Sequence, residues 1–203
     1  KKEPFLDEGK RYRFLLPAEL PNFYPFIKVV DTSTIAYEKD IDRQYAIGLW
    51  VDVFRLSHCD SDFSMTQRKS KRIKRLREIN KLAVCGDFRT PRYKAIAPFV
   101  KIAKTLLNIA GKNPIALSRQ MQKIEEGMPM QGHLLMDITW ADSIEHFFDE
   151  SLWRNSILID FCGKQFYAPK NYDGVLTAQF GDYMQLPPEK DRIRHDFEAY
   201  FLN

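Results

Sequence analysis

The stretch Gly48–Phe54 most constrains how this chain can fold, because it places one carboxylate inside a run of apolar and β-branched residues. Such a run is typical of a β-strand that is covered on at least one face. An ionised Asp52 inside the strand costs free energy unless another group pairs with it. Two interpretations stay open. Asp52 either faces solvent or caps a loop, or it faces a cleft and binds a metal ion, as carboxylates do in phosphoryl-transfer enzymes.

Composition indicates an ordinary folded protein. The length of 203 residues predicts one domain with room for a helical lobe, and 44% hydrophobic with 29% charged residues excludes a disordered chain. The net charge of +4 suits an anionic substrate or surface without requiring one. Cys59, Cys85 and Cys162 have neither zinc nor disulfide spacing, which indicates a reducing compartment. No apolar run reaches the roughly 18–20 residues that span a bilayer.

The N-terminal part predicts strands separated by prolines. Residues 13–16 read as an edge strand, residues 26–31 as a second strand and residues 35–37 as its return strand in a hairpin. Lys28 alternates with apolar neighbours, so it reaches one face of the sheet. There it is either solvated or in contact with a phosphate group.

A strongly basic segment follows a polar loop at 57–62, whose Cys, His and Asp residues are too close together for a structural zinc site. Apolar residues at every third position between 67 and 81 predict an amphipathic helix with a cationic face that includes Lys71, Arg72, Lys74 and Arg75. This face is either simply solvated or docks an anionic membrane or a nucleic acid. Without aromatic residues in the run, nucleic acid is the weaker alternative.

Two more helices are predicted after the basic one. Residues 95–110 form one apolar stripe, and Asn113 followed by Pro114 predicts the start of a helix that continues to Glu126 and ends at Gly127. Together with the basic helix they predict a helical lobe over residues 65–126.

The C-terminal third returns to strands. Residues 134–140 predict a strand that joins the sheet of 26–30 and 49–54, residues 142–148 a short helix, and residues 157–167 a hairpin that turns at Gly163. We expect Asp137 and Asp160 to face outward. A helix capped by Asn171 or Asp173 runs to Phe180 and ends at Gly181. The predicted fold class is α+β, a small mixed sheet with a packed helical lobe.

The residue patterns of three segments resemble those of the LicD family. Residues 169–188 carry Pro-Lys, Tyr-Asp, Phe-Gly-Asp-Tyr-Met and Leu-Pro-Pro at the family's spacing, and Phe197-Glu198-Ala199-Tyr200 follows. Residues 28–34 are similar to its K-V-x-D-T-x-T segment, and residues 48–54 are similar to its G-x-W-V-D-x-F strand. The family belongs to the nucleotidyltransferase-like superfamily, and fukutin and fukutin-related protein are similar in this region.

The resemblance implies transfer of a phospho-alcohol, best known as phosphocholine from CDP-choline, to a sugar hydroxyl of a cell-surface glycan precursor. It implies a divalent cation such as Mg²⁺ held by carboxylates, with Asp52 as a catalytic ligand and Lys28 at the phosphate. Donor and head-group contacts fall on Lys170, Tyr172, Asp173, Asp182 and Tyr183. A cytoplasmic location follows, with peripheral contact to the inner membrane face through the basic helix and an acceptor that can be lipid-linked.

One part of the family pattern has no counterpart here. The family carries a W-D-D-D-I-D-I-G segment upstream of K-V-x-D-T, and the nearest string in this chain, Lys39–Asp42, follows Asp31 instead. The chain therefore reads as a LicD-like domain over 1–203 that is incomplete at its N-terminal side and inactive alone. The alternative is a non-catalytic binding module that docks an anionic membrane, a glycopolymer or a protein.

Overall fold

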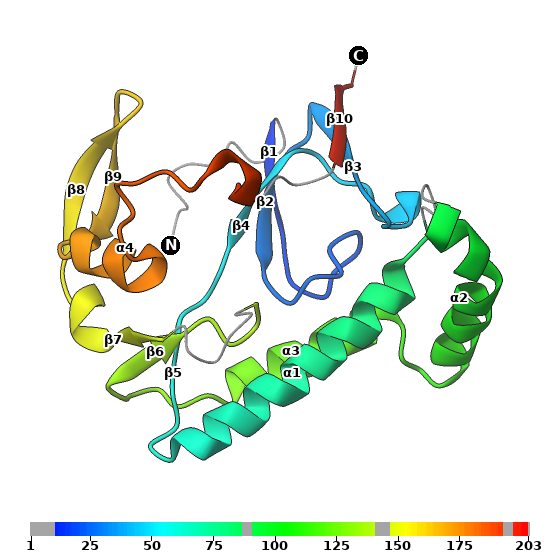
Figure 1. Ribbon diagram of the computed structural model, residues 1–203, viewed down its shortest axis with the longest axis horizontal. Coiled ribbons are helices and arrows are strands. Elements are labelled where there is room, and N and C mark those ends of the chain that lie inside the picture. Colours follow the sequence, from blue (N-terminus) through cyan, green and yellow to red (C-terminus); the bar gives the residue numbers. More distant parts are fainter. Residues whose placement is uncertain (1–10, 87–90, 141–146, 193–196, 203) are drawn as a thin grey trace. The chain divides into compact units, whose positions relative to one another are not determined.

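The computed structural model describes residues 11–86, 91–140, 147–192 and 197–202 (Figure 1). Helices and short strands make this an α+β protein, as predicted, and the strand pairings in the described ranges are antiparallel. The chain divides into two compact units. The first unit comprises the described residues within 1–55, 71–127 and 195–203, and the second those within 56–70 and 128–194.

The first unit is built on a three-stranded sheet in the order β1-β2-β4. β1 (Tyr12–Leu15) is an edge strand, β2 (Ile27–Asp31) is central and β4 (Trp50–Val53) contains Asp52, which confirms the three strands predicted for these segments. Leu15 of β1 and Val30 of β2 form a small core with Ile47, which precedes β4, and Trp50 packs against this core. The apolar alternation of these strands produces this core because one face of the sheet is covered.

The return strand of the predicted hairpin has a different partner. β3 (Thr34–Glu38) does not lie beside β2 but pairs with β10 (Phe197–Phe201), so the predicted hairpin was wrong. The local pattern identified the strand correctly. Its partner lies far away in the sequence, and local alternation carries no information about such a pairing.

Three helices complete the first unit. α1 (Phe63–Val84) begins in the second unit and ends in the first, and α2 (Pro91–Ile109) follows it. α3 (Pro114–Glu126) has the predicted ends, because the Asn113 side chain accepts a hydrogen bond from the Ala116 amide at 2.9 Å and Gly127 is the C-cap. Asn80 and Ser118 donate to the carbonyls of Phe23 and Tyr24, which ties α1 and α3 to the N-terminal segment.

The second unit contains a second sheet and a hairpin. β5 (Ser57–His58), β6 (Leu134–Met136) and β7 (Phe148–Asp149) form one antiparallel sheet in that order. The prediction that residues 134–140 join the sheet of β2 and β4 was therefore wrong. The strand ends at Met136 because the Asp137 carboxylate accepts hydrogen bonds from the amides of Thr139 and Trp140, which turns the chain. Of the helix predicted over 142–148, residues 142–146 lie outside the described residues and Phe148 belongs to β7.

The hairpin of β8 (Ser156–Phe161) and β9 (Lys164–Pro169) forms as predicted. Cys162 and Gly163 both have positive φ values, 50° and 74°, which suit the tight two-residue turn that matches the twist of the strands. α4 (Tyr172–Phe180) follows. Asn171 is its N-cap and Gly181, with φ 68°, its C-cap, so the open choice between Asn171 and Asp173 falls on Asn171. Short 3₁₀ helices at Arg43–Tyr45, Glu150–Trp153 and Glu189–Asp191 complete the described elements.

Candidate functional site

The strand register places Lys28 directly opposite Asp52. β2 and β4 are antiparallel neighbours, so side chains at paired positions lie on the same face of the sheet. Lys28 Nζ is 2.8 Å from Asp52 Oδ1, a distance at which the ammonium donates a charge-assisted hydrogen bond. The expected proximity of these two predicted site residues is therefore present in the structure.

Aromatic rings enclose the ammonium group of Lys28. Its Nζ lies 4.2 Å from the ring centroid of Tyr24, 4.4 Å from that of Trp50 and 5.3 Å from that of Phe26. Lys28 is only 2% exposed, whereas the Asp52 side chain is 31% exposed. The pair is thus a buried cation, held by ring faces and one carboxylate, whose anionic partner reaches the surface.

Burial and charge act on Lys28 in opposite directions. Loss of solvent is the larger effect and lowers the pKa of Lys28, while the hydrogen bond and charge of Asp52 and the charge of Glu38 raise it. Glu38 also accepts a hydrogen bond from the Tyr24 hydroxyl at 2.9 Å. Burial and this carboxylate raise the pKa of Tyr24, so Tyr24 stays protonated and its ring stays a neutral wall of the site.

The segments 28–34 and 48–54 meet at the start of β4. The Asp31 amide donates to the Leu49 carbonyl, and the Leu49 amide donates to the Thr34 hydroxyl, both at 2.8 Å. The Asp31 carboxylate itself accepts hydrogen bonds from Arg11 and Ser33. Asp31 therefore fixes the turn after β2 and the register of β4, which in turn sets Lys28 opposite Asp52.

The described residues do not complete a cation site around Asp52. Among them, no three His, Cys, Asp or Glu side chains lie close enough together to hold a metal ion. Asp52 supplies one carboxylate, and Lys28 occupies one of its oxygens. A divalent cation prefers several oxygen ligands, so Asp52 with its described neighbours does not fit Mg²⁺ by itself.

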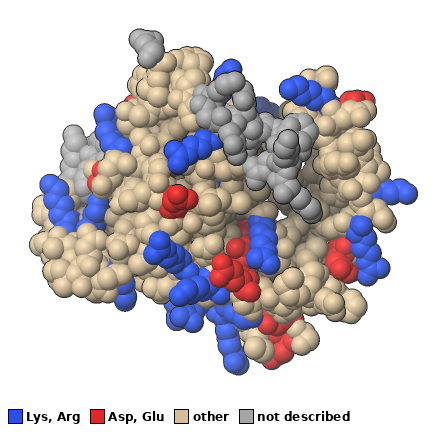
Figure 2. Space-filling view, turned by 180° about the vertical axis from the view of Figure 1, so that it is seen from behind, with Lys and Arg blue, Asp and Glu red and all other residues tan. Residues whose placement is uncertain are grey.

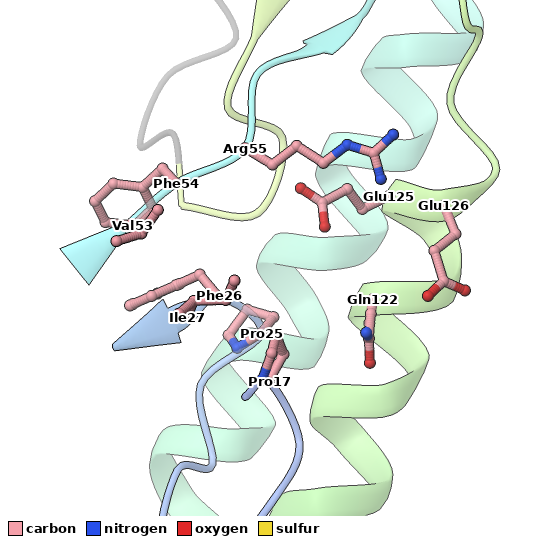
Figure 3. Close-up of a pocket in the computed structure, with 10 residues that line it drawn as sticks. All are labelled: Pro17, Pro25, Phe26, Ile27, Val53, Phe54, Arg55, Gln122, Glu125 and Glu126. Atoms are coloured by element: carbon pink, nitrogen blue, oxygen red, sulfur yellow. The ribbon is translucent and has the colours of Figure 1, made fainter. Parts of the chain in front are cut away.

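A pocket of about 320 Å³ lies where the chain leaves β4 (Figure 3). Figure 3 shows Val53 and Phe54 on one side, α3 residues on the other, and Arg55 extended toward Glu125. Neither Lys28 nor Asp52 lines this pocket. The lining residues are Pro17, Pro25, Phe26, Ile27, Val53, Phe54, Arg55, Gln122, Glu125 and Glu126.

The predicted donor-binding residues lie in the second unit, around α4. The Tyr183 hydroxyl donates to Asp173 Oδ1 at 2.7 Å, and this hydrogen bond raises the pKa of Tyr183. Lys170, Tyr172, Asp173 and Asp182 are exposed. The structure thus brings two of the five predicted residues into direct contact. Their shared cleft with Asp52, which belongs to the first unit, stays a prediction.

The cationic face of α1 is only partly free. Lys71, Arg72, Lys74 and Arg75 are exposed, as the helical pattern predicted. By contrast, Lys69 pairs with Asp60, Lys81 pairs with Glu78, and Arg77 is 5% exposed. Figure 2 shows that Lys and Arg side chains on one face of the molecule lie among carboxylates and large uncharged areas.

A second pocket, of about 720 Å³, lies in the second unit beside the loop at 59–62. Cys59, Asp60, His133 and Glu150 are among its lining residues, and His58 Nε2 is 3.6 Å from Glu150. Burial raises the pKa of the Cys59 thiol to about 11, which keeps it protonated and unreactive at neutral pH.

Sequence reasoning missed the aromatic surroundings of Lys28. Trp50 was detectable as a neighbour of Asp52, because residues two apart on a strand share a face. Tyr24 and its partner Glu38 were not, because neither lies on β2 or β4. Arg11, which holds Asp31, gave no signal in the sequence.

Comparison with known proteins gives one partial relationship. No family model matches the chain, and no solved structure gives a significant match. Lipopolysaccharide cholinephosphotransferase LicD of Haemophilus influenzae is 39% identical to the chain over 57 residues. The match covers 28% of this chain and 22% of that protein. Part of the chain is therefore LicD-like, in agreement with the motifs.

Membrane-spanning helices are absent from the described ranges, since none of their helices is both long and apolar enough to cross a bilayer.

Proposed function

We propose that this chain belongs to a LicD-type transferase that moves phosphocholine from CDP-choline to a sugar hydroxyl of a cell-surface glycan precursor. The observation that carries the proposal is the 39% identity to a cholinephosphotransferase over 57 residues. The Lys28–Asp52 pair supports it, because the two segments that resemble the family's motifs supply the two partners. Transfer would break the bond between the phosphate of phosphocholine and CMP, which leaves with the bonding electron pair, and would form a new bond to the sugar oxygen, which loses its proton.

In this proposal Asp52 is the catalytic carboxylate. Lys28 neutralises and orients one Asp52 oxygen, and the partly exposed carboxylate can face a ligand. A direct contact of Lys28 with a phosphate stays part of the proposal, although its ammonium is enclosed by rings in this conformation. Mg²⁺, which we propose as the cofactor, would reduce the charge on the phosphate, with Asp52 as one of its ligands.

The donor head group is assigned to the second unit. Choline is a quaternary ammonium ion, and such ions bind the faces of aromatic rings. Tyr172 is 47% exposed, and Tyr183 is oriented by Asp173. We propose that these rings contact the head group, with Lys170, Asp173 and Asp182 nearby.

The test is the release of CMP from CDP-choline, with Mg²⁺ and a lipid-linked glycan preparation as the acceptor. Asp52→Asn should lower turnover by orders of magnitude, because it removes the ligand charge and keeps the shape. Asp160→Asn, on the exposed hairpin, is the matched control and should leave turnover unchanged. Turnover of Asp52→Asn close to that of the unaltered chain would remove Asp52 from the reaction.

A second candidate function is a non-catalytic binding module. The absence of a three-ligand group in the described part of the chain favours it. Such a module would bind CDP-choline or a glycan, measured by calorimetry, without releasing CMP. Binding without turnover in the presence of Mg²⁺ would support the module and contradict the transferase.

We also propose peripheral contact of the protein with the cytoplasmic membrane face through α1. Its four exposed cations each contribute on the order of 1 kcal/mol near an anionic surface. We expect cosedimentation with anionic vesicles at low salt, lost near about 0.5 M salt because the Debye length becomes short. Changing Lys71, Arg72, Lys74 and Arg75 to Gln should weaken the binding and reduce its dependence on salt. Equal binding to neutral vesicles would contradict an electrostatic contact.

A further inference from the structure

Helix α2 carries a row of large apolar side chains that nothing in the described structure covers. Phe99 is 73% exposed, Ile102 60%, Leu106 60% and Ile109 78%. Their spacing of three, four and three residues places them on one side of the helix. Burying even one such side chain is favourable by about 1.5–3 kcal/mol, so four in a row form a strong attachment surface.

The opposite side of α2 is held by the first unit. Val100 is 8% exposed, and Lys104 Nζ donates to the Cys85 carbonyl at 2.8 Å and lies 3.3 Å from Asp42 Oδ2. Since an α-helix turns by about 100° per residue, Val100 and Lys104 lie on the other side from the exposed row. The row is therefore directed away from the contacts that hold the helix.

The charge of α2 has one sign. The helix contains no Asp or Glu, and Lys101 within it and Lys112 just after it are exposed. At 100° per residue Lys101 falls beside one border of the apolar row, and Lys112 follows the end of the helix. A second copy of α2 packed on this row would offer the cations no carboxylate, because the helix contains no Asp or Glu. An anionic lipid surface would neutralise them and accept the apolar side chains.

We propose that α2 lies in the plane of an anionic membrane surface and inserts Phe99, Ile102, Leu106 and Ile109 between the lipids. A helix of this kind buries its apolar face about 5–10 Å into the head-group region while its lysines stay at the phosphates. With 19 residues, α2 is about 28 Å long. This attachment differs from the contact through α1, because it adds apolar burial to charge, and it does not depend on the transferase proposal.

The first test is flotation with vesicles of phosphatidylcholine, with and without phosphatidylglycerol. Phe99→Gln with Leu106→Gln should weaken binding to the anionic vesicles at least about tenfold, because each side chain contributes on leaving water. The matched control is Phe161→Gln with Tyr167→Gln, which removes two exposed rings from the β8–β9 hairpin and should not change binding. Circular dichroism verifies that both variants are folded. Equal loss in both pairs, or no loss in the α2 pair, would overturn the proposal.

The second test locates the helix relative to the lipids. Phe99→Trp should show blue-shifted emission and quenching by brominated lipid, beyond that of the unaltered chain with its three tryptophans. Thr105→Trp, on the lysine side of α2, should show less of both. Equal quenching at the two positions would overturn insertion of the apolar row. Sedimentation velocity tests the alternative occupant. If the unaltered chain is a dimer and the variant with Phe99→Gln and Leu106→Gln is a monomer, the row binds a second copy of the chain instead.

Discussion

A Cβ atom at Gly48 would lie 2.0 Å from the backbone oxygen of Asp31. No real Cβ approaches an oxygen this closely, so the chain needs glycine here for space. The contact occurs where the turn after β2 closes on the start of β4. Gly48 therefore lets the two segments approach closely enough for Lys28 and Asp52 to pair.

Gly48→Ala should lower the free energy of unfolding by about 3 kcal/mol, because the backbone of two segments has to move apart. Urea unfolding measures this change. Gly127→Ala is the matched control, since a Cβ at that position meets its nearest atoms at an ordinary 3.5 Å. A Gly48→Ala protein as stable as this control would show that the segments do not close as described.

Asp52→Asn should cost more stability than Lys28→Met. The first change removes the carboxylate that is hydrogen-bonded to a buried ammonium and should lower the free energy of unfolding by about 2 kcal/mol. Methionine instead fills the ring-lined space with an apolar chain of similar length, and the 31% exposed Asp52 can be solvated. Urea unfolding of both variants and of the double variant gives the coupling between the two residues. Additive effects would argue against the pair.

Ionised Asp31 should make the free energy of unfolding fall as the pH becomes acidic. The hydrogen bonds from Arg11 and Ser33 lower the pKa of Asp31 from 3.8 to about 2. Because the folded state holds this carboxylate ionised, its contribution is complete above about pH 4 and is lost as the pH falls through 2. Asp31→Asn should flatten the loss of stability between pH 4 and pH 2. Unfolding midpoints over this range measure it, and an unchanged slope would contradict the assignment.

Tyr183→Leu should weaken CDP-choline binding about two- to fivefold, whereas Tyr183→Phe should not. A cation binds the face of the ring, at roughly 0.5–1 kcal/mol for an exposed site, and Phe keeps that face. Calorimetry gives the dissociation constants, with thermal unfolding alongside. If the Tyr183→Leu variant binds CDP-choline as tightly as the unaltered chain, Tyr183 and its hydrogen bond to Asp173 serve only to anchor the segment after α4.

The ends of elements that carry local capping or turn residues could be predicted closely from the sequence. α3 begins and ends where the Asn-Pro and Gly signals place it, and the β8–β9 hairpin turns at Gly163. Both depend on hydrogen bonds and φ values within a few residues. The partners of β3 and β6 could not be predicted in this way, because β10 and β5 lie far from them in the sequence and several registers satisfy the same alternation.

The candidate site, too, could be predicted only where the signal is local in the sequence. Asp52 was identifiable as a carboxylate in an apolar strand that needs a partner, and Lys28 as the cation on a neighbouring strand. That these two residues face each other follows from the β2–β4 register, which only the structure gives. The enclosure of Lys28 by Tyr24 depends on a loop before β2, so no strand pattern could reveal it.

The thiols of the second unit differ in how easily a reagent can reach them. Cys162 is exposed at the tip of the hairpin, whereas Cys59 is 5% exposed and has a raised pKa. Alkylation by a maleimide should therefore modify Cys162 first and reach Cys59 only when this unit opens. Mass spectrometry can follow the labelling of each thiol separately. The labelling rate of Cys59 then reports how often the second unit opens, and the labelling rate of Cys162 gives the intrinsic reactivity of the reagent.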